Sequence, residues 1–198
     1  MEDQFSEKRV HSEFQMDPKH TAVLVVDMLN EFLEDGGLMV LPGGEVLYEP
    51  IRRLVDAAHE AGMPVFWLNQ SLSEDDKLFE KRVKHCITGS WGAQIVEALP
   101  HTSKHDITIP KRRYSGFFQT DLDLHLRERD IRHVVVTGVV TNICVRSTVN
   151  DAFFLGYNVI VPQDCVAATS PALQEAHLYD IDTHYGTVVN VDEVLARI

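Results

Sequence analysis

Short, strongly apolar segments recur along this chain, and helical patterns separate them. The clearest of these segments are Thr21–Asp27, Pro64–Asn69, Arg132–Gly138 and Tyr157–Pro162. Nearly continuous apolar runs of this length are typical of strands that are buried on both faces of a parallel sheet. Strands that alternate with helices predict an α/β fold, here a three-layer α/β/α sandwich around a mostly parallel, doubly wound sheet. Because ligands bind beyond the carboxyl ends of the strands in such sheets, we expect a functional site at that edge.

Weaker patterns predict the remaining elements. We expect further strands at Asp106–Pro110 and Gly186–Val189, and further helices from about Leu47 to Gly62, at Gly92–Leu99, at Pro171–Leu178 and at residues 191–197. Thr120 and Asp123 have the spacing of a capping box, which would open a helix that reaches about Arg129. The helix after Gly138 is expected to turn one face inward, formed by Val145, Val149, Ala152 and Phe153. Residues 71–91 are polar and irregular, which favours a loop or a lid.

Length, charge and terminal composition limit the class of protein. A chain of 198 residues suits a single domain over residues 1–198, in which residues 1–19 form an extended N-terminal arm. No apolar run approaches the roughly 18 residues of a membrane span, and Met1–Asp17 has no signal-peptide core. We therefore expect a cytoplasmic protein that does not bind membranes. A formal net charge of −12 argues against nucleic-acid binding, which uses basic surfaces.

The cysteines and histidines do not form a recognisable structural motif. The three cysteines are Cys86, Cys144 and Cys165, and an odd number without an export signal favours reduced thiols. No CxxC pair and no Cys/His spacing of a structural zinc site occurs, and the ten histidines show no helical metal motif. We expect no metal ion and no cofactor. The sequence has no Gly-x-Ser-x-Gly motif, the motif that would indicate a serine nucleophile.

Three chemically capable residues fall at the predicted edge of the sheet. Asp27 ends the first strand, Lys111 directly follows the Ile107–Pro110 run, and Cys144 lies beyond the strand that ends at Gly138. Each has an ordinary structural explanation when taken alone. A free cysteine is usually a small buried hydrophobe, an aspartate can cap a turn, and a lysine can lie in solvent. Their shared placement favours a common site.

The position of Cys144 suits a nucleophile. A thiol attacks as the thiolate, and the first turn of a helix lowers a thiol pKa through free N–H groups and the helix dipole. A nearby ammonium would lower the pKa further, and an adjacent carboxylate could take the proton. Free N–H groups at the same helix start could hold an oxyanion. Cys86 and Cys165 have no such setting, so we interpret both as structural.

Several blocks of sequence resemble the isochorismatase-like cysteine hydrolase family. They are Val25–Asn30, Pro110–Phe118, Thr137–Val145 and Asp151–Tyr157, and their order and spacing agree with the family over about residues 20–190. The resemblance implies the isochorismatase-like hydrolase fold and a Cys144–Asp27–Lys111 triad. In this triad Asp27 takes the thiol proton, Lys111 pairs with Asp27, and Cys144 forms a thioester with the substrate. The resemblance also implies a cis peptide between Val139 and Val140, with the N–H groups of Val140 and Cys144 as the oxyanion hole.

Within the family, the chain is most similar to the ureidoacrylate and N-carbamoyl amidohydrolases, through Gly89–Gln94, Arg113–Phe118 and Asp180–Thr183. This similarity implies hydrolysis of a small linear amide, with a ureido or N-carbamoyl C–N bond as the target. We expect a mostly apolar pocket lined by Trp91, Tyr114, Phe117 and Phe118, with Asn69 and Gln70 recognising the amide group. For all six, core packing or turn hydrogen bonding is the alternative explanation.

Two other functions stay open at this level. Nicotinamidases of the same fold bind a metal through an Asp-x-His pair, which this chain lacks, since Asn69 and Gln70 stand where a histidine is expected. A catalytically idle member would serve in binding or assembly, although no member of the triad is missing. Family analogy implies a homo-oligomer such as a tetramer, in which the 71–91 loop closes over its own site or completes a neighbour's.

Overall fold

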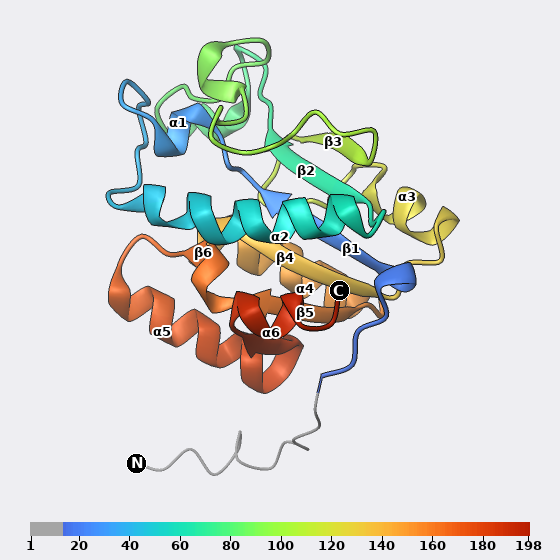
Figure 1. Cartoon of the computed structure of the whole chain (residues 1–198). Coiled ribbons are helices and arrows are strands. Elements are labelled where there is room, and N and C mark those ends of the chain that lie inside the picture. The colour runs from blue at the N-terminus through green and yellow to red at the C-terminus, as the bar shows by residue number, and fades with distance from the viewer. Residues whose placement is uncertain (1–13) are drawn as a thin grey trace.

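The computed structural model describes residues 14–198, and these residues form a parallel sheet between two layers of helices (Figure 1). The strands are β1 (Thr21–Val26), β2 (Val65–Gln70), β3 (Asp106–Lys111), β4 (His133–Val139), β5 (Asn158–Pro162), β6 (Val166–Ala167) and β7 (Thr187–Val189). The sheet runs in the order β3-β2-β1-β4-β5-β7, and β6 pairs with β4. Every paired strand is parallel to its neighbour. The strands β1, β2 and β4 therefore occupy the middle of the sheet, as doubly wound topology requires.

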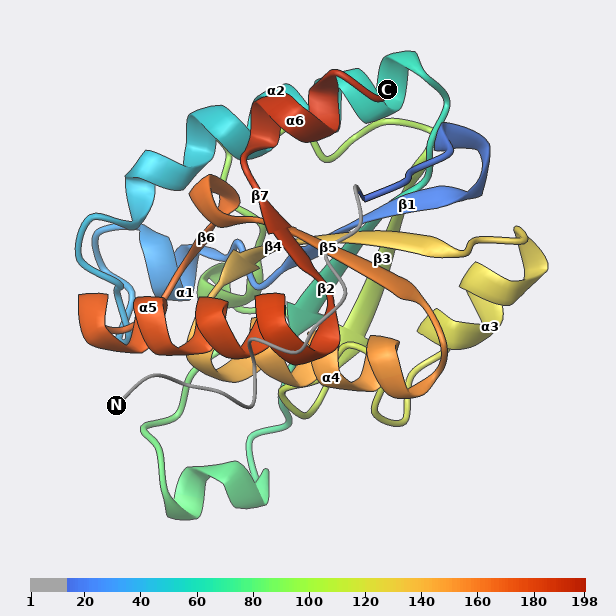
Figure 2. The ribbon, with the colours of Figure 1, turned by 90° about the horizontal axis from the view of Figure 1, so that it is seen from below.

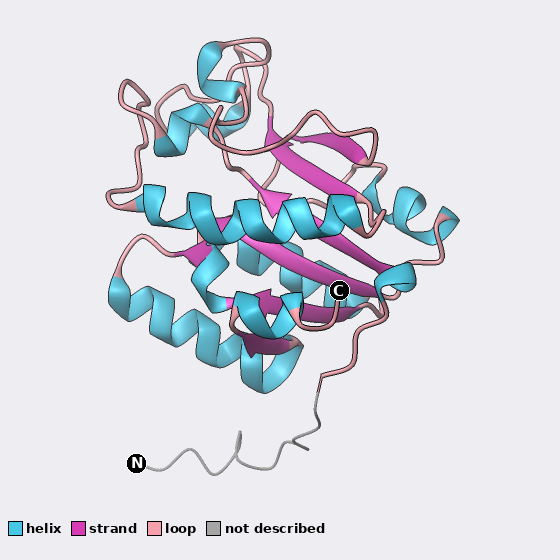
Figure 3. Cartoon of the chain, in the orientation of Figure 1, coloured by secondary structure: helices cyan, strands magenta, loops and turns pink. Residues whose placement is uncertain are grey.

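Helices cover both faces of this sheet (Figures 2 and 3). They are α1 (Asn30–Leu33), α2 (Tyr48–Glu60), α3 (Leu122–Glu128), α4 (Arg146–Phe154), α5 (Pro171–Asp180) and α6 (Val191–Leu195). The apolar residues of α2 and α6 belong to one core, and those of α3 and α4 belong to the other. The predicted three-layer α/β/α sandwich is confirmed. None of the helices within residues 14–198 is long and apolar enough to cross a membrane.

The strand β1 shows why its sequence is apolar throughout. All six of its residues are buried. Val23 and Val25 pack into the core beneath α2 and α6, whereas Ala22, Leu24 and Val26 pack into the core beneath α3 and α4. Successive side chains of a strand point to opposite faces, so a central strand between two helical layers needs apolar residues at every position.

The predicted helix at Gly92–Leu99 is wrong. Only Trp91–Ala93 forms a short 3-10 turn; Ile95 then makes an isolated antiparallel bridge with Leu29, just after β1, and the chain turns again at Glu97 and Ala98. Val96 donates its backbone N–H to Met28 O at 3.1 Å, and Asn30 donates its N–H to Gln94 O at 2.9 Å. These bonds to a neighbouring segment replace the bonds that a helix would make within itself.

The predicted capping box is also wrong. The helix α3 begins at Leu122 after Asp121, and the Thr120 hydroxyl donates to the carbonyl of Gly116 instead of capping the helix in the predicted way. On α4, Val145, Val149 and Ala152 are buried as predicted, but Phe153 is exposed. The Phe153 ring contacts the neighbouring Phe154 ring and the Tyr185 ring at the surface.

The predicted N-terminal arm lies mostly outside the described residues, which begin at Phe14. Phe14 packs against the core beneath α2 and α6, and the Arg197 guanidinium lies 3.9 Å from the centre of its ring. Pro18–His20 forms a 3-10 turn that leads into β1. The described part of the arm therefore packs against the sandwich.

Candidate active site

Asp27, Lys111 and Cys144 meet at the carboxyl edge of the sheet. Asp27 follows β1, Lys111 is the last residue of β3, and Cys144 lies in the turn between β4 and α4. Lys111 Nζ donates to Asp27 Oδ2 at 2.7 Å, and the two side chains are 0% and 1% exposed. The Cys144 thiol is also buried, and Asp27 and Lys111 lie close enough to it for both side chains to shift its pKa. Because these parallel strands end at one edge, residues 27, 111 and 144 converge despite their separation in sequence.

The backbone around Asp27 fixes the direction of its carboxylate. Asp27 has a left-handed backbone conformation with φ of 50°, which bends the chain away from β1 directly after the strand. Its N–H donates to Leu68 O at 3.0 Å, so the bend remains attached to β2. The backbone N–H of Gln70 donates to Asp27 Oδ1 at 2.8 Å. One carboxylate oxygen is thus held by the Gln70 amide and the other by Lys111.

The turn that carries Cys144 depends on a close approach between β1 and β4. Gly138 has φ of 100°, and a Cβ at this position would overlap the backbone of Val26. The next peptide bond, between Val139 and Val140, is cis, as the family resemblance implies. Cys144 then lies in a π-helical turn, Thr141–Val145, and the regular α4 begins only at Arg146. The expected α-helical first turn is therefore replaced by a wider one.

Hydrogen bonds hold this turn in place. Val140 O accepts the N–H groups of Ile143 at 3.0 Å and Val145 at 3.3 Å. The Thr148 hydroxyl donates to Cys144 O at 2.8 Å and accepts the Gly116 N–H at 3.0 Å. Thr148 therefore ties the backbone of Cys144 both to α4 and to the loop after β3.

Burial decides the protonation of the thiol. It raises the pKa of Cys144 above its ordinary value, the Lys111 ammonium opposes this, and the Asp27 carboxylate adds to it. The expectation of a lowered thiol pKa is thus wrong in direction, because desolvation of the thiolate outweighs the ammonium. For Lys111, burial is the largest single effect and favours the neutral amine, but the Asp27 charge, the neighbouring thiols and the hydrogen bond to Asp27 together outweigh it and raise the pKa. The resting site holds a neutral thiol beside a buried ion pair.

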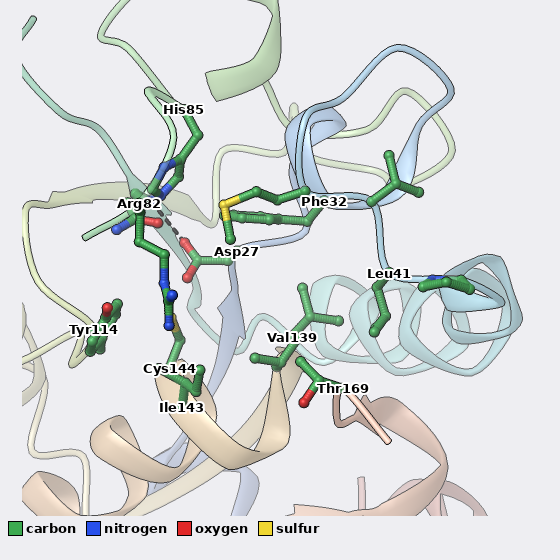
Figure 4. A pocket seen from close by; sticks show the side chains of 15 residues that line it. Asp27, Phe32, Leu41, Arg82, His85, Tyr114, Val139, Ile143, Cys144 and Thr169 are labelled. Atoms are coloured by element: carbon green, nitrogen blue, oxygen red, sulfur yellow. Dashed lines mark hydrogen bonds between the residues drawn. The ribbon is translucent and has the colours of Figure 1, made fainter. Parts of the chain in front are cut away.

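Asp27 and Cys144 open into a pocket of about 350 Å³ (Figure 4). Of the side chains expected to bind substrate, Gln70 and Tyr114 line this pocket. The Gln70 side chain is buried, and its Nε2 has no hydrogen-bond partner among the described residues. The pocket therefore offers a buried amide donor near the carboxylate and the thiol.

The other expected substrate-binding residues lie elsewhere, and three of the four aromatic side chains do not line this pocket. Trp91 is 48% exposed and lies beside Gly36. Phe117 is buried in the core, with its ring centre 5.8 Å from that of Tyr157. Phe118 is 50% exposed in a separate hollow. Asn69 is buried outside the pocket lining, because it points to the opposite face of β2 from Gln70.

Sequence reasoning missed most of the pocket wall. The unpredicted lining residues are Phe32, Met39, Val40, Leu41, Pro42, Arg82, His85, Val139, Ile143 and Thr169. Arg82 and His85 belong to the 71–91 segment that was expected to form a loop or lid. The polar composition of residues 71–91 indicates a loop or lid near the site, but it does not indicate which side chains of the loop face the pocket.

The 71–91 loop is anchored at several points. Asp76 forms ion pairs with two arginines: its Oδ2 lies 2.7 Å from Arg112 Nη2, and its Oδ1 lies 3.1 Å from Arg113 Nη1. A hydrogen bond from the Leu78 amide, and then those from the two arginines, lower the pKa of the buried Asp76 to about 2. The His85 ring packs edge-on between two phenylalanines at centre distances of 6.0 and 5.8 Å. This loop is a fixed wall of the pocket in the structure.

Glu31 joins the loop to the opposite wall. Its side chain is buried, with Oε1 accepting the Leu38 N–H at 2.6 Å and Oε2 accepting the Cys86 N–H at 3.2 Å. A Cβ at Gly92 would overlap the same carboxylate. Two connections, the loop after α1 and the long connection between β2 and β3, thus converge on one carboxylate beside the pocket.

The architecture is that of the isochorismatase-like hydrolases, and comparison with known proteins agrees. The family model of the isochorismatase domain matches residues 21–193. Ureidoacrylate amidohydrolase RutB from Cronobacter sakazakii is 38% identical over an alignment of 216 positions, gaps included, that covers 91% of this chain and 93% of that relative. The chain therefore belongs to the isochorismatase family.

Solved structures share the whole fold. N-carbamoylsarcosine amidase from Thermoplasma acidophilum is 33% identical, with a TM-score of 0.78 over 87% of this chain and 96% of that chain. Nicotinamidase PncA from Bacillus subtilis is 27% identical, with a TM-score of 0.82 over 86% of this chain and 99% of that chain. The names of these two enzymes refer to different amide substrates, so the fold alone does not select one substrate.

The donor set was also tested against the metal centre that the family resemblance attributes to nicotinamidases. Within residues 14–198, no group of three or more His, Cys, Asp and Glu side chains is placed to hold a metal ion. His85 lines the pocket, but its Nδ1 donates to Val83 O at 2.7 Å and its ring packs between phenylalanines. These residues do not fit such a centre.

Proposed function

We propose that this chain is an amidohydrolase that cleaves a small linear ureido or N-carbamoyl C–N bond through a thioester on Cys144. The observation that carries the proposal is the convergence of a buried thiol, carboxylate and ammonium beside one pocket. The similarity to an ureidoacrylate amidohydrolase and to an N-carbamoylsarcosine amidase supports this substrate class.

In the first half-reaction, Cys144 Sγ attacks the carbonyl carbon while its proton passes to Asp27. The raised thiol pKa makes this transfer part of the attack, and Asp27 is the carboxylate beside the thiol. The N–H groups of Val140 and Cys144, both pocket residues, hold the oxyanion. Collapse breaks the C–N bond, Asp27 returns the proton to the leaving nitrogen, and ammonia leaves a carbamoyl thioester.

In the second half-reaction, water attacks the thioester after giving a proton to Asp27. The C–S bond breaks and the sulfur recovers its proton. A ureido substrate leaves as a carbamic acid, which decomposes to an amine and carbon dioxide. The Gln70 amide and Lys111 hold the two oxygens of Asp27 throughout, so the carboxylate keeps one orientation towards the reacting atoms.

Gln70 and Tyr114 supply polar contacts for the substrate. The buried Gln70 Nε2 lacks a partner among the described residues, and it can donate to a ureido oxygen. Leaving a buried donor unsatisfied costs free energy, so a substrate that pairs with it gains binding. This favours a carbonyl-rich, compact substrate over an aliphatic amide.

The proposal is tested with Cys144→Ala and Cys144→Ser, using Cys165→Ala as the matched control because Cys165 is also buried but lies outside the pocket. Ammonia release is measured over ureidoacrylate, N-carbamoyl amino acids, biuret and nicotinamide. We expect both Cys144 variants to lose activity by at least about a thousandfold while circular dichroism shows an intact fold. Mass spectrometry of the parent enzyme, quenched during turnover and digested, should show a carbamoyl adduct on the peptide that contains Cys144.

Full activity in Cys144→Ala would overturn the mechanism. Preference for nicotinamide would select the nicotinamidase-like alternative, and inactivity on all amides would favour the binding or assembly role. Homo-oligomerisation is a separate proposal from family analogy, and light scattering of the purified chain would test it.

A further inference from the structure

We infer that Arg82 binds a carboxylate of the substrate, so that this pocket selects ureido or N-carbamoyl compounds that carry an acid group away from the scissile bond. This inference rests on the proposed function and assigns the substrate class of the same site. Arg82 lines the pocket that Asp27 and Cys144 also line. In Figure 4 its side chain extends from the loop towards Tyr114 and Cys144.

The pocket's other charges are already balanced. The Asp27 carboxylate is paired with Lys111 at 2.7 Å, and burial keeps the Cys144 thiol neutral. Among residues 14–198, Arg82 makes no side-chain hydrogen bond or ion pair, although its backbone N–H donates to Leu78 O at 3.1 Å. An arginine is always charged in proteins, so this exposed side chain brings to the pocket mouth a positive charge that has no counter-ion among the described residues.

Unlike Arg82, two other arginines close to the 71–91 loop have a carboxylate partner. Arg112 and Arg113 lie close to the same loop, and both are committed to Asp76. Asp76, the buried carboxylate of the same loop, is therefore already paired and is not the counter-ion of Arg82. A guanidinium matches a carboxylate with two parallel hydrogen bonds, which makes a carboxylate the fitting counter-ion.

The rest of the wall strengthens this pairing. Most of the remaining lining residues are apolar, including Phe32, Val139 and Ile143. Charge interactions are stronger beside apolar walls than in open water. The protein carries a net charge of −12, which repels anions at long range. A local unpaired cation at the pocket therefore offsets that repulsion at the place where an anionic substrate must bind.

The anchored loop makes Arg82 an effective contact. Asp76, His85 and Cys86 fix the loop to β3, to Phe32 and to Glu31 respectively. Their contacts hold the backbone around Arg82 before the ligand arrives, so less conformational entropy is lost on binding. The scissile carbonyl then lies by Cys144 and Gln70, and the acid group lies by Arg82. Nicotinamide and biuret lack an acid group, so neither can place a carboxylate at Arg82 while its carbonyl lies by Cys144.

The test compares two substrates that differ only at the far end, 3-ureidopropanoate and the neutral N-(3-hydroxypropyl)urea. The kcat/KM ratio of acid to alcohol is measured for the parent chain, Arg82→Gln, Arg82→Lys and Lys81→Gln. Lys81→Gln removes the same charge from the same loop, but Lys81 does not line the pocket. We expect the ratio to fall about ten- to a hundredfold in Arg82→Gln, mainly through KM, and to fall less in Arg82→Lys. We expect Lys81→Gln to keep the parent ratio.

Binding to the Cys144→Ala background separates this inference from the proposed chemistry. Calorimetry should show 3-ureidopropanoate binding at least about tenfold more weakly when Arg82→Gln is added. An unchanged acid-to-alcohol ratio, or an equal loss in Lys81→Gln, would overturn the assignment of Arg82 while leaving the hydrolase intact. If the parent chain cleaves neither compound, the calorimetric difference alone decides the role of Arg82, and the proposed function is decided by the wider amide panel.

Discussion

At the scale of single residues, burying the ion pair of Lys111 and Asp27 costs folding free energy, and a role in the chemistry would explain why the pair is kept. Removing two charges from water costs several kcal/mol for each ion, and replacing a buried pair with apolar residues often stabilises a protein. Burial opposes the Lys111 charge, yet Asp27 raises its pKa, so the ammonium persists. The pair's contribution to stability is present in full below the unfolded lysine pKa of 10.5, and is lost as pH rises towards the higher folded value.

Breaking this pair on one side should be worse than removing both charges. Lys111→Met leaves Asp27 buried without its partner, and we expect a loss of about 3–5 kcal/mol in unfolding free energy together with loss of activity. Adding Asp27→Asn, which tolerates the left-handed backbone, should recover most of the stability without restoring turnover. Urea denaturation and ammonia release measure the two effects. A double variant as unstable as Lys111→Met would mean that packing of the lysine chain, and not its charge, holds the site together.

At the scale of secondary structure, the β1–β4 contact determines where the Cys144 turn begins. Val26 pairs with Gly138, and Asp27 and the cis Val139–Val140 peptide follow these two residues. A side chain at Gly138 would push apart the ends of the two strands whose following residues supply the carboxylate and the thiol. The strand pairing and the site therefore share one steric requirement.

Gly138→Ala compared with Gly156→Ala separates steric overlap from backbone preference. Both glycines have positive φ, 100° and 86°, but only Gly138 would place a Cβ against other atoms within 4 Å. We expect Gly156→Ala to cost about 1–2 kcal/mol, the ordinary penalty of a left-handed alanine, and to remain active. Gly138→Ala should cost clearly more and should also lower kcat. Equal losses in urea denaturation of the two variants would show that the β1–β4 approach is not tight.

The same scale shows what the sequence can predict. The apolar runs locate the strands because a central strand must be apolar at every position, and parallel strand ends then place Asp27, Lys111 and Cys144 at one edge. The pocket wall is harder, because turns determine it. The extended segment after Trp91 pairs with residues 28–30, which no helical periodicity reveals. Adjacent strand residues point to opposite faces, so Asn69 and Gln70 could not both be expected to line one pocket.

At the scale of the whole molecule, the three thiols are buried in separate surroundings. Cys144 belongs to the core beneath α3 and α4, Cys165 belongs to the core beneath α2 and α6, and Cys86 lies at the loop joined to Glu31. Burial is the largest cause that raises the pKa of each thiol above its ordinary value of 9.0. Burial in this fold therefore disfavours the thiolate form of all three cysteines, including Cys144, whose sulfur is the proposed nucleophile.

This exclusion predicts sensitivity to alkali. The stability that comes from neutral thiols is present in full below pH 9.0, because folded and unfolded chains are then equally protonated. Above that pH the unfolded chain loses protons first, so unfolding free energy should fall by up to about 1.4 kcal/mol per pH unit for each thiol. Urea denaturation at pH 8, 9 and 10 measures the slope. Cys165→Ala, which leaves the pocket unchanged, should have a shallower slope by the share of one thiol. If the two slopes are identical, Cys165 ionises as readily in the folded chain as in the unfolded one, and the two cores do not exclude charge equally.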